Sequence, residues 1–213
     1  IANLKYGTTY LWQIVVLDKS GDPVFGPVTQ FTTVGFPDNR ILFCRKINGA
    51  YQIFSSNPAG TTTVQLTDGA SNNWRPRMNP QRTKIAFLSD EGIDPQIVTM
   101  NRDGSDRQKI TILPVAGYNK YDLDFCWSPD GSRLLYMNQG KLYRINHDGS
   151  GLQLFASAPA GFTFTECDWF GNFTPKIAAR TTGEYIFNSE ILLFDEQGVL
   201  QSKIVADTAG GLS

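Results

Sequence analysis

Four turns decide how this chain folds: Asn57-Pro58-Ala59-Gly60, Asn101-Arg102-Asp103-Gly104, Asn146-His147-Asp148-Gly149 and Asp195-Glu196-Gln197-Gly198. They share the pattern Asn/Asp-x-x-Gly, and their glycines lie 44, 45 and 49 residues apart. Each turn follows a short apolar stretch, such as Gln96–Met100 or Ile191–Phe194. A fixed period of this size is typical of an architecture built from stacked structural repeats.

The clearest copy of the repeat predicts four strands, at Asp124–Trp127, Arg133–Asn138, Lys141–Asn146 and Leu152–Phe155. Ser128-Pro129-Asp130-Gly131 predicts a turn between the first two, because Pro presets φ and Gly accepts a positive φ. The copy before it starts at Arg75, and the one before that matches only from Phe36 onward. The fourth copy, from Glu166, is degenerate. No segment keeps an apolar i, i+3, i+4, i+7 pattern for three turns, so we expect no substantial helix.

Four-stranded units of about 40–50 residues with Gly-rich turns are typical of β-propeller blades. A single such sheet cannot bury both of its faces, whereas blades stacked around an axis cover one another. We therefore predict an all-β fold, a partial β-propeller of about four four-stranded blades. The large residues expected to pack between blades are Met78, Phe87, Phe125, Trp127, Tyr136 and Trp169.

Two segments, Trp127–Tyr136 and Gln96–Ser105, resemble the repeat of TolB-like propellers. Val64–Thr67 and Arg107–Thr111 are similar to the closing strand of that repeat. The resemblance covers about residues 36–206, weakens after Thr165, and implies a propeller domain over residues 35–213 whose ring is incomplete.

Residues 1–33 carry a different pattern. Leu4–Val16 and Gly26–Thr33 resemble the last two strands of a fibronectin type III domain. Leu4, Gly7 and Tyr10 match its tyrosine corner, in which the hydroxyl bonds an upstream backbone group. The resemblance implies the C-terminal strands of such a domain over residues 1–34, and a chain that is processed or a fragment. In the alternative, Tyr10–Asp18 and Val28–Val34 form the outer hairpin of an earlier blade, since Asp18-Lys19-Ser20-Gly21 also fits the turn pattern.

The composition disfavours two classes of partner. The formal net charge is −1, which gives no electrostatic reason to expect nucleic acid or an anionic membrane. We interpret the basic residues around Arg75, Arg77, Arg82 and Lys84 as solvated charges at strand edges. No apolar run approaches the ~20 residues that a membrane-spanning helix needs.

We predict no catalytic, cofactor-binding or metal-binding residue. Cys44, Cys126 and Cys167 lack metal-ligand spacing and are expected to be buried free thiols. His147 is expected to be an exposed turn residue, and Asn101–Asp106 a plain β-turn, because it lacks the downstream glutamate of a calcium loop. Asp124 and Asp168 are expected to make structural hydrogen bonds to a turn or a neighbouring blade.

The predicted function is that of a non-catalytic binding or scaffold protein outside the cytoplasm, in the periplasm, at the cell surface or secreted. Loops near Thr67–Asn73, Pro114–Tyr121 and Ser157–Thr165 join consecutive blades and are expected on one face. The candidate partner-binding residues there are of types favoured at interfaces: Trp74, Tyr118, Tyr121 and Phe162. We expect a protein partner, with a glycan as the alternative.

Two other functions stay open. One is a structural subunit of a larger surface or filament assembly, in which neighbouring chains complete the partial domains. The other is the propeller domain of a hydrolase or lyase whose catalytic part is absent. The sequence lacks a Gly-x-Ser-x-Gly elbow and a set of histidines for a metal, which disfavours this second alternative.

Overall fold

The computed structural model describes residues 4–92, 94–117, 123–171, 173–174, 176–183 and 189–205. Within these ranges the secondary-structure elements are all β-strands, as the short apolar runs predict. No helix in the described part of the chain is long and apolar enough to cross a membrane.

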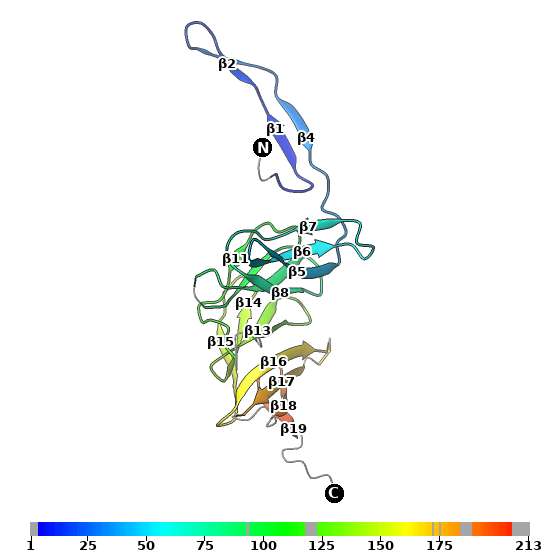
Figure 1. The fold of residues 1–213 in the computed structure, drawn as a ribbon, viewed down its shortest axis with the longest axis vertical. Helices are drawn as coiled ribbons and strands as arrows, with labels where there is room; N and C mark the ends of the chain where they lie inside the picture. The colour runs from blue at the N-terminus through cyan, green and yellow to red at the C-terminus, as the bar shows by residue number, and fades with distance from the viewer. Residues whose placement is uncertain are drawn as a thin grey trace.

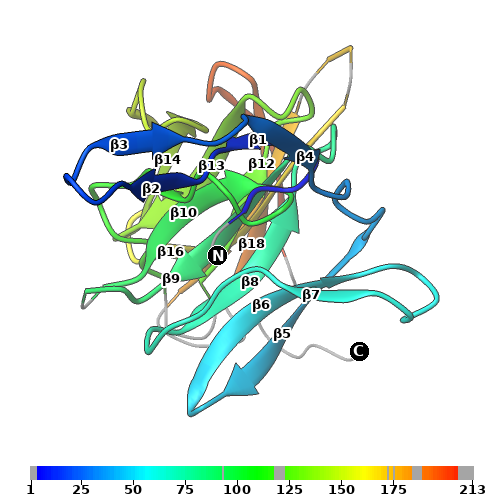
Figure 2. The same ribbon diagram turned by 90° about the horizontal axis from the view of Figure 1, so that it is seen from above.

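Most strands belong to four antiparallel sheets, each formed by strands consecutive in the chain. Figures 1 and 2 show the sheets following one another through the molecule in chain order. Three of the sheets have four strands and the first has three. The first sheet contains β5 (Ile41–Ile47), β6 (Ala50–Ser56) and β7 (Thr63–Gln65); the second contains β8 (Asn73–Met78), β9 (Lys84–Ser89), β10 (Gln96–Asn101) and β11 (Gln108–Lys109); the third contains β12 (Phe125–Trp127), β13 (Arg133–Asn138), β14 (Lys141–Asn146) and β15 (Gln153–Ser157); and the fourth contains β16 (Thr163–Phe170), β17 (Lys176–Thr182), β18 (Ser189–Asp195) and β19 (Leu200–Val205).

The sequence pattern locates these strands well. β13 and β14 have the predicted bounds, and β12 and β15 differ from prediction by one or two residues at their ends. The first sheet lacks an inner strand, as expected from a repeat copy that matches only from its turn onward. The degenerate fourth copy nevertheless forms four strands, and β16 is longer than its sequence pattern indicated.

The four repeated turns close with the same hydrogen bond. In each, the glycine N–H donates to the carbonyl oxygen of the Asn or Asp three residues earlier, at 2.9–3.1 Å. The glycines have φ between 71° and 87°, in the left-handed region where a side chain is disfavoured. This geometry explains why the pattern demands glycine at its last position.

Three of these glycines also touch the preceding sheet. A Cβ on Gly104 would lie 3.0 Å from the carbonyl oxygen of Leu66, and one on Gly149 would lie 3.1 Å from that of Ile110. A Cβ on Gly198 would overlap the carbonyl oxygen of Phe155. Gly60, in the first sheet, has no atom within 4 Å of the same position. The turn is therefore both a hairpin closure and a contact between consecutive sheets.

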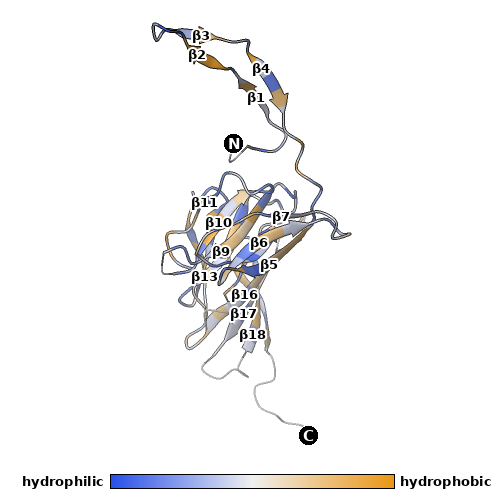
Figure 3. Cartoon of the chain, turned by 45° about the horizontal axis from the view of Figure 1, so that its top comes forward, coloured by the Kyte–Doolittle hydropathy of each residue, from blue (hydrophilic) through white to orange (hydrophobic). Residues whose placement is uncertain are grey.

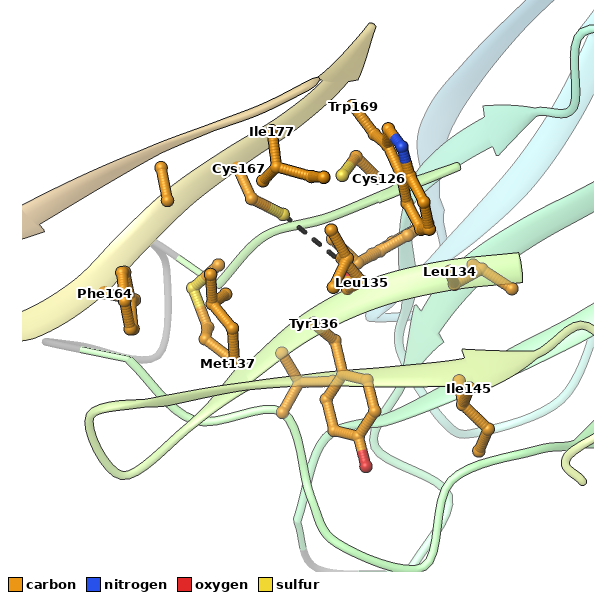
Figure 4. Packing of buried hydrophobic residues seen from close by; sticks show 14 of the residues in the cluster. Cys126, Leu134, Leu135, Tyr136, Met137, Ile145, Phe164, Cys167, Trp169 and Ile177 are labelled. Atoms are coloured by element: carbon orange, nitrogen blue, oxygen red, sulfur yellow. Dashed lines mark hydrogen bonds between the residues drawn. The ribbon is translucent and has the colours of Figure 1, made fainter. Parts of the chain in front are cut away.

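The core lies between the sheets. One buried cluster joins the first two sheets and includes Ile53, Phe87 and Met100. A larger cluster joins the second, third and fourth. Figure 4 shows part of this larger cluster, where Cys167 Sγ is directed toward the Leu135 carbonyl oxygen at 3.7 Å. The packing role predicted for the large residues is confirmed, because Met78 is half-buried and the others are buried: Phe87, Phe125, Trp127, Tyr136 and Trp169.

Two expectations about single residues are wrong. Cys126 and Cys167 are buried free thiols, but Cys44 is exposed because it lies on β5, the first strand of the three-stranded sheet. His147 is half-buried rather than exposed. Its backbone is held between two sheets, since its N–H donates to Ser132 O and its carbonyl accepts from Thr99 Oγ1. The turn at Asn101–Asp106 is closed by its own side chains, as expected of a plain β-turn.

The N-terminal segment forms a separate hairpin that projects from the stack (Figure 1). β1 (Thr9–Trp12) pairs with β4 (Thr29–Thr32), and β2 (Val15–Leu17) pairs with β3 (Pro23–Phe25). These pairs form sheets of two strands only and do not extend a sheet of the stack.

The Tyr10 hydroxyl accepts a hydrogen bond from the Lys5 N–H at 2.7 Å, which is the form expected of a tyrosine corner. The assignment to fibronectin type III, and the division at residue 34, stay predictions. Many apolar side chains of the hairpin are exposed, and Figure 3 shows β2 in the colour of hydrophobic residues.

Replacing Gly198 by Ala tests the contact between turn and sheet. We expect the positive φ alone to cost about 1 kcal/mol of unfolding free energy, and the overlap with Phe155 O to add about 1–3 kcal/mol. Gly60→Ala is the matched control, since it has the same turn and open space around the new Cβ. Urea unfolding of both variants measures the difference, and equal losses would contradict this account of the turn.

Candidate functional site

A cleft of about 420 Å³ opens where the first strands of the last three sheets converge, and strands of the fourth sheet extend it. This volume lies within the range of about 300–1,000 Å³ typical of ligand-binding clefts. β8 supplies Arg75 and Arg77, Asp124 directly precedes β12, and β16 supplies Glu166, Cys167 and Asp168. β12 lies against β16. The lining residues are Arg75, Arg77, Asp124, Glu166, Cys167, Asp168, Ala178, Ala179, Arg180 and Ile191.

One wall of the cleft consists of two arginines that contact a buried carboxylate. Arg77 Nη2 lies 2.7 Å from Asp124 Oδ1, and Arg75 Nη1 lies 3.3 Å from the same oxygen. The Asp124 side chain is only 5% exposed, whereas the two arginine side chains are 36% and 39% exposed. Both guanidinium groups therefore contact the buried carboxylate and stay partly exposed.

The backbone supports the same wall. Trp127 Nε1 donates to the Arg77 carbonyl oxygen at 3.0 Å, which fastens β12 to β8. The Cys167 N–H donates to Asp124 Oδ2 at 3.5 Å, which brings in β16. Burial raises the pKa of Asp124 above its ordinary value, outweighing the attraction of the Arg77 and Arg75 guanidiniums.

A proline explains how both arginines reach Asp124. Pro76 has no N–H for the β8–β9 ladder, and the pairing shifts register between Trp74 and Arg77. Arg75, just before the proline, has φ of 50°. A non-glycine residue in the left-handed region costs about 1–3 kcal/mol, and such strain often occurs at functional sites. β-Bulges also occur often next to functional sites, where they change the direction of a side chain.

Carboxylates of β16 line another part of the cleft. Glu166 and Asp168 are two residues apart on β16, so they lie on the same face of the strand. Glu166 faces Arg180 across the β16–β17 ladder, at 3.6 Å between charged atoms, and both side chains are more than 40% exposed. Asp168 instead faces Ala178, and it has no hydrogen bond or ion pair with another described residue. This part of the lining therefore holds two carboxylates and one guanidinium group.

The remaining lining residues are apolar or small: Cys167, Ala178, Ala179 and Ile191. Among the described residues, no group of three or more His, Cys, Asp or Glu side chains is arranged to hold a metal ion. The arrangement is suited to binding, because charged side chains of both signs and small or apolar side chains line one cleft.

The predicted partner-binding residues do not form this cleft. Trp74 lies in β8 rather than in a loop, and it is half-buried against the large core cluster. It therefore does not have the exposure that its place near a blade junction suggested. Phe162 is half-buried in the turn before β16. Tyr118 and Tyr121 lie outside the described residues, so a shared face of these four side chains stays a prediction.

The sequence interpretation missed the charged residues of the cleft. Arg75 and Arg77 were expected to be solvated strand-edge charges, but they bond a buried carboxylate of the next sheet. The structural hydrogen bonding expected of Asp124 is confirmed. Asp168, for which the same was expected, lines the cleft and has no hydrogen bond to another described residue. The signal in the sequence was Arg-Pro-Arg in an inner strand, where the proline predicts a bulge.

Comparison with known proteins supports the propeller fold. No family model matches the sequence. An uncharacterized protein of Agrobacterium fabrum is 27% identical over 110 residues, which is 47% of this chain and 37% of that protein. The chain thus spans well under half the length of this relative.

Among solved structures, a putative TolB from Agrobacterium tumefaciens has a TM-score of 0.56 at 14% identity, covering 93% of this chain and 80% of that one. TolB from Acinetobacter baumannii has a TM-score of 0.51 at 15% identity, covering 71% and 37%. The tricorn protease has a TM-score of 0.53 at 13% identity, covering 93% and 20%. At these identities the likeness concerns the fold: the chain is an all-β protein with the sheet arrangement of TolB-like propellers.

The raised pKa of Asp124 predicts how stability depends on pH. A carboxyl group with a higher pKa in the folded protein than in the unfolded chain stabilises the fold most when it is protonated. This contribution is present below the ordinary value of 3.8 and is lost as the pH rises through the folded pKa. Asn cannot ionise, so the Asp124→Asn variant does not lose stability through this group. Its unfolding free energy, compared with that of the unsubstituted protein, should therefore rise as the pH increases from about 3.5 to 7.

Urea unfolding of both proteins across this pH range measures the trend. Asp22→Asn, on the exposed hairpin, is the control. If the attraction of Arg75 and Arg77 instead outweighed burial, the relative stability of Asp124→Asn would fall as the pH rises, which would contradict the prediction.

Proposed function

We propose that this chain is a non-catalytic binding or scaffold module that recognises a protein partner through the cleft between β8, β12 and β16. The observation that carries the proposal is the cleft itself, which is lined by basic, acidic, small and apolar side chains drawn from three sheets. Polar groups fixed in advance bind with less loss of conformational entropy, which favours specific recognition.

The geometry of the wall supports binding rather than packing alone. Arg75 is held in a strained conformation and Asp124 is buried, and the guanidinium groups so positioned remain more than a third exposed. Propellers also present loops at the ends of their blades. Here the connections β7–β8, β11–β12 and β15–β16 join consecutive sheets, and their contribution to one partner surface is part of the proposal.

The proposed location is outside the cytoplasm, in the periplasm, at the cell surface or secreted. It rests on the resemblance of the repeats to those of TolB-like propellers. Fractionation of the source cells tests it, and recovery of the protein in the cytoplasmic fraction would contradict it.

A second candidate function, that of a structural subunit, is favoured by the N-terminal hairpin. Its large apolar side chains are widely exposed, including Leu11 at 70%, Leu17 at 71% and Phe25 at 63%. An isolated two-stranded hairpin is at best marginally stable in water. Contact with a neighbouring chain would cover this surface in an assembly.

Filling the cleft tests its role in binding. Ala178 is half-buried and lines the cleft, so Ala178→Trp introduces a large side chain there. We expect this variant to lose at least about tenfold in affinity for a protein captured from an extract of the source cells, as expected when a central contact region is blocked. Thr63→Trp, on the exposed strand β7, is the matched control. Equal capture by both variants would overturn the proposed site.

The non-catalytic assignment has its own test. Incubation of the chain with proline-containing peptides and with pectate fragments should release no product above the level of a heat-denatured sample. Turnover that is lost in the Ala178→Trp variant would contradict the binding-module proposal and favour the hydrolase or lyase alternative.

A further inference from the structure

Two buried thiols meet between the third and fourth sheets, and the proposed binding role does not use their reactivity. Cys126 lies on β12 and is 2% exposed, and Cys167 lies on β16 and is 5% exposed. Both are free in the structure and belong to the large core cluster. β12 packs against β16, so the two cysteines approach each other although they are distant in the sequence.

Three contacts fix the relative position of these thiols. Leu135 is the ladder partner of Cys126, and its carbonyl oxygen accepts a hydrogen bond from Cys167 Sγ at 3.7 Å. The Cys167 N–H donates to Oδ2 of Asp124, two residues before Cys126. The Cys126 thiol lies within hydrogen-bonding reach of the Cys167 thiol, and Figure 4 shows both sulfur atoms in the space beside Leu135. The two side chains therefore point toward each other, as the residues of a disulfide must.

The repeat does not require cysteine at either position. Counted along the ladder from the repeated turn, Arg77 and Asp168 occupy the places in the second and fourth sheets that correspond to Cys126. Phe125 occupies the place in the third sheet that corresponds to Cys167. The two cysteines thus stand at different positions of the repeat, and only the packing of β16 on β12 brings their thiols together.

We propose that Cys126 and Cys167 are a cross-linking site, at which a disulfide joins β12 to β16 when the chain folds in the presence of a disulfide oxidant. The bond fastens the third sheet to the fourth beside the cleft, which Cys167 lines. Compartments outside the cytoplasm favour disulfides, so the site accords with the proposed location. The inference does not depend on recognition of a partner.

The reaction balances as two thiol–disulfide exchanges with a small disulfide such as oxidised glutathione. The thiolate of one cysteine attacks a sulfur of glutathione disulfide, which forms a mixed disulfide and releases one glutathione. The thiolate of the other cysteine attacks the protein sulfur of this mixed disulfide and releases the second glutathione. The protein gives up two electrons and two protons, and glutathione disulfide becomes two glutathione thiols.

The burial of the site determines when this reaction is fast. Hydrogen bonding to the Cys126 thiol and burial raise the pKa of the Cys167 thiol well above its ordinary value, so little thiolate is present in the folded protein. We therefore expect the bond to form during folding, while both thiols are accessible.

The test uses the full chain with the Cys44→Ala substitution, which removes the exposed thiol. This variant is refolded from urea with a mixture of oxidised and reduced glutathione, and separately with reduced glutathione alone. The first sample should weigh about 2 Da less, for the two hydrogens removed, and its tryptic digest should contain the peptides of Cys126 and Cys167 joined. The unsubstituted chain should give the same joined peptides. No loss of mass, glutathione left attached to Cys126 or Cys167, or a link from Cys44 to either would overturn the proposal.

The melting temperature shows whether the bond fits the native packing. Because a cross-link restricts the unfolded chain, the oxidised Cys44→Ala protein should melt at least about 5 °C above the reduced one. The matched control carries Cys44→Ala and Cys126→Ala together and cannot form the bond, so its melting temperature should be the same in both glutathione solutions. An oxidised protein that melts at or below the temperature of the reduced one would indicate a strained bond and overturn the proposed site.

Discussion

The structure depends on one constraint: each sheet must cover a face of the next without a gap. The repeated turn satisfies this constraint at the edge of the sheets, because Gly104, Gly149 and Gly198 bring their backbone against carbonyl oxygens of the preceding sheet. A Cβ at these positions would hold the sheets apart and leave voids, which close-packed interiors do not tolerate. The same contact fixes the relative placement of consecutive sheets, and thereby where their first strands meet.

The cleft follows from this placement. β8, β12 and β16 converge at the inner side of the stack, so a side chain on one sheet meets side chains of the next two. Asp124 is held in this way by Arg75 and Arg77 of the preceding sheet and by the Cys167 N–H of the following one. A carboxylate buried between sheets is costly unless it is paired, and here its pairing also positions the two guanidinium groups that line the cleft.

The sequence predicts the strands and turns better than the cleft, for a physical reason. Strand patterns and turns such as Ser128–Gly131 or Asp195–Gly198 depend on neighbours within a few residues, and the structure forms them as expected. The cleft joins residues about 50 and 90 positions apart, and whether Asp124 or Asp168 points inward is set by register and by the bulge at Pro76. Periodicity does not contain this information, so Arg75 and Arg77 looked like ordinary solvated charges. Trp74 was expected to be exposed, but its strand packs it against the core.

The cleft and the N-terminal hairpin differ in chemistry, and this difference bears on the choice between the two candidate functions. The hairpin exposes apolar side chains, so covering it removes hydrocarbon from water and contributes mainly affinity. The cleft exposes paired charges, which contribute specificity and association rate more than affinity. Recognition through the cleft and assembly through the hairpin are therefore compatible in one protein. A partner that contacted only the hairpin would leave the strain at Arg75 without a function, which is why the cleft is the stronger basis for the proposed role.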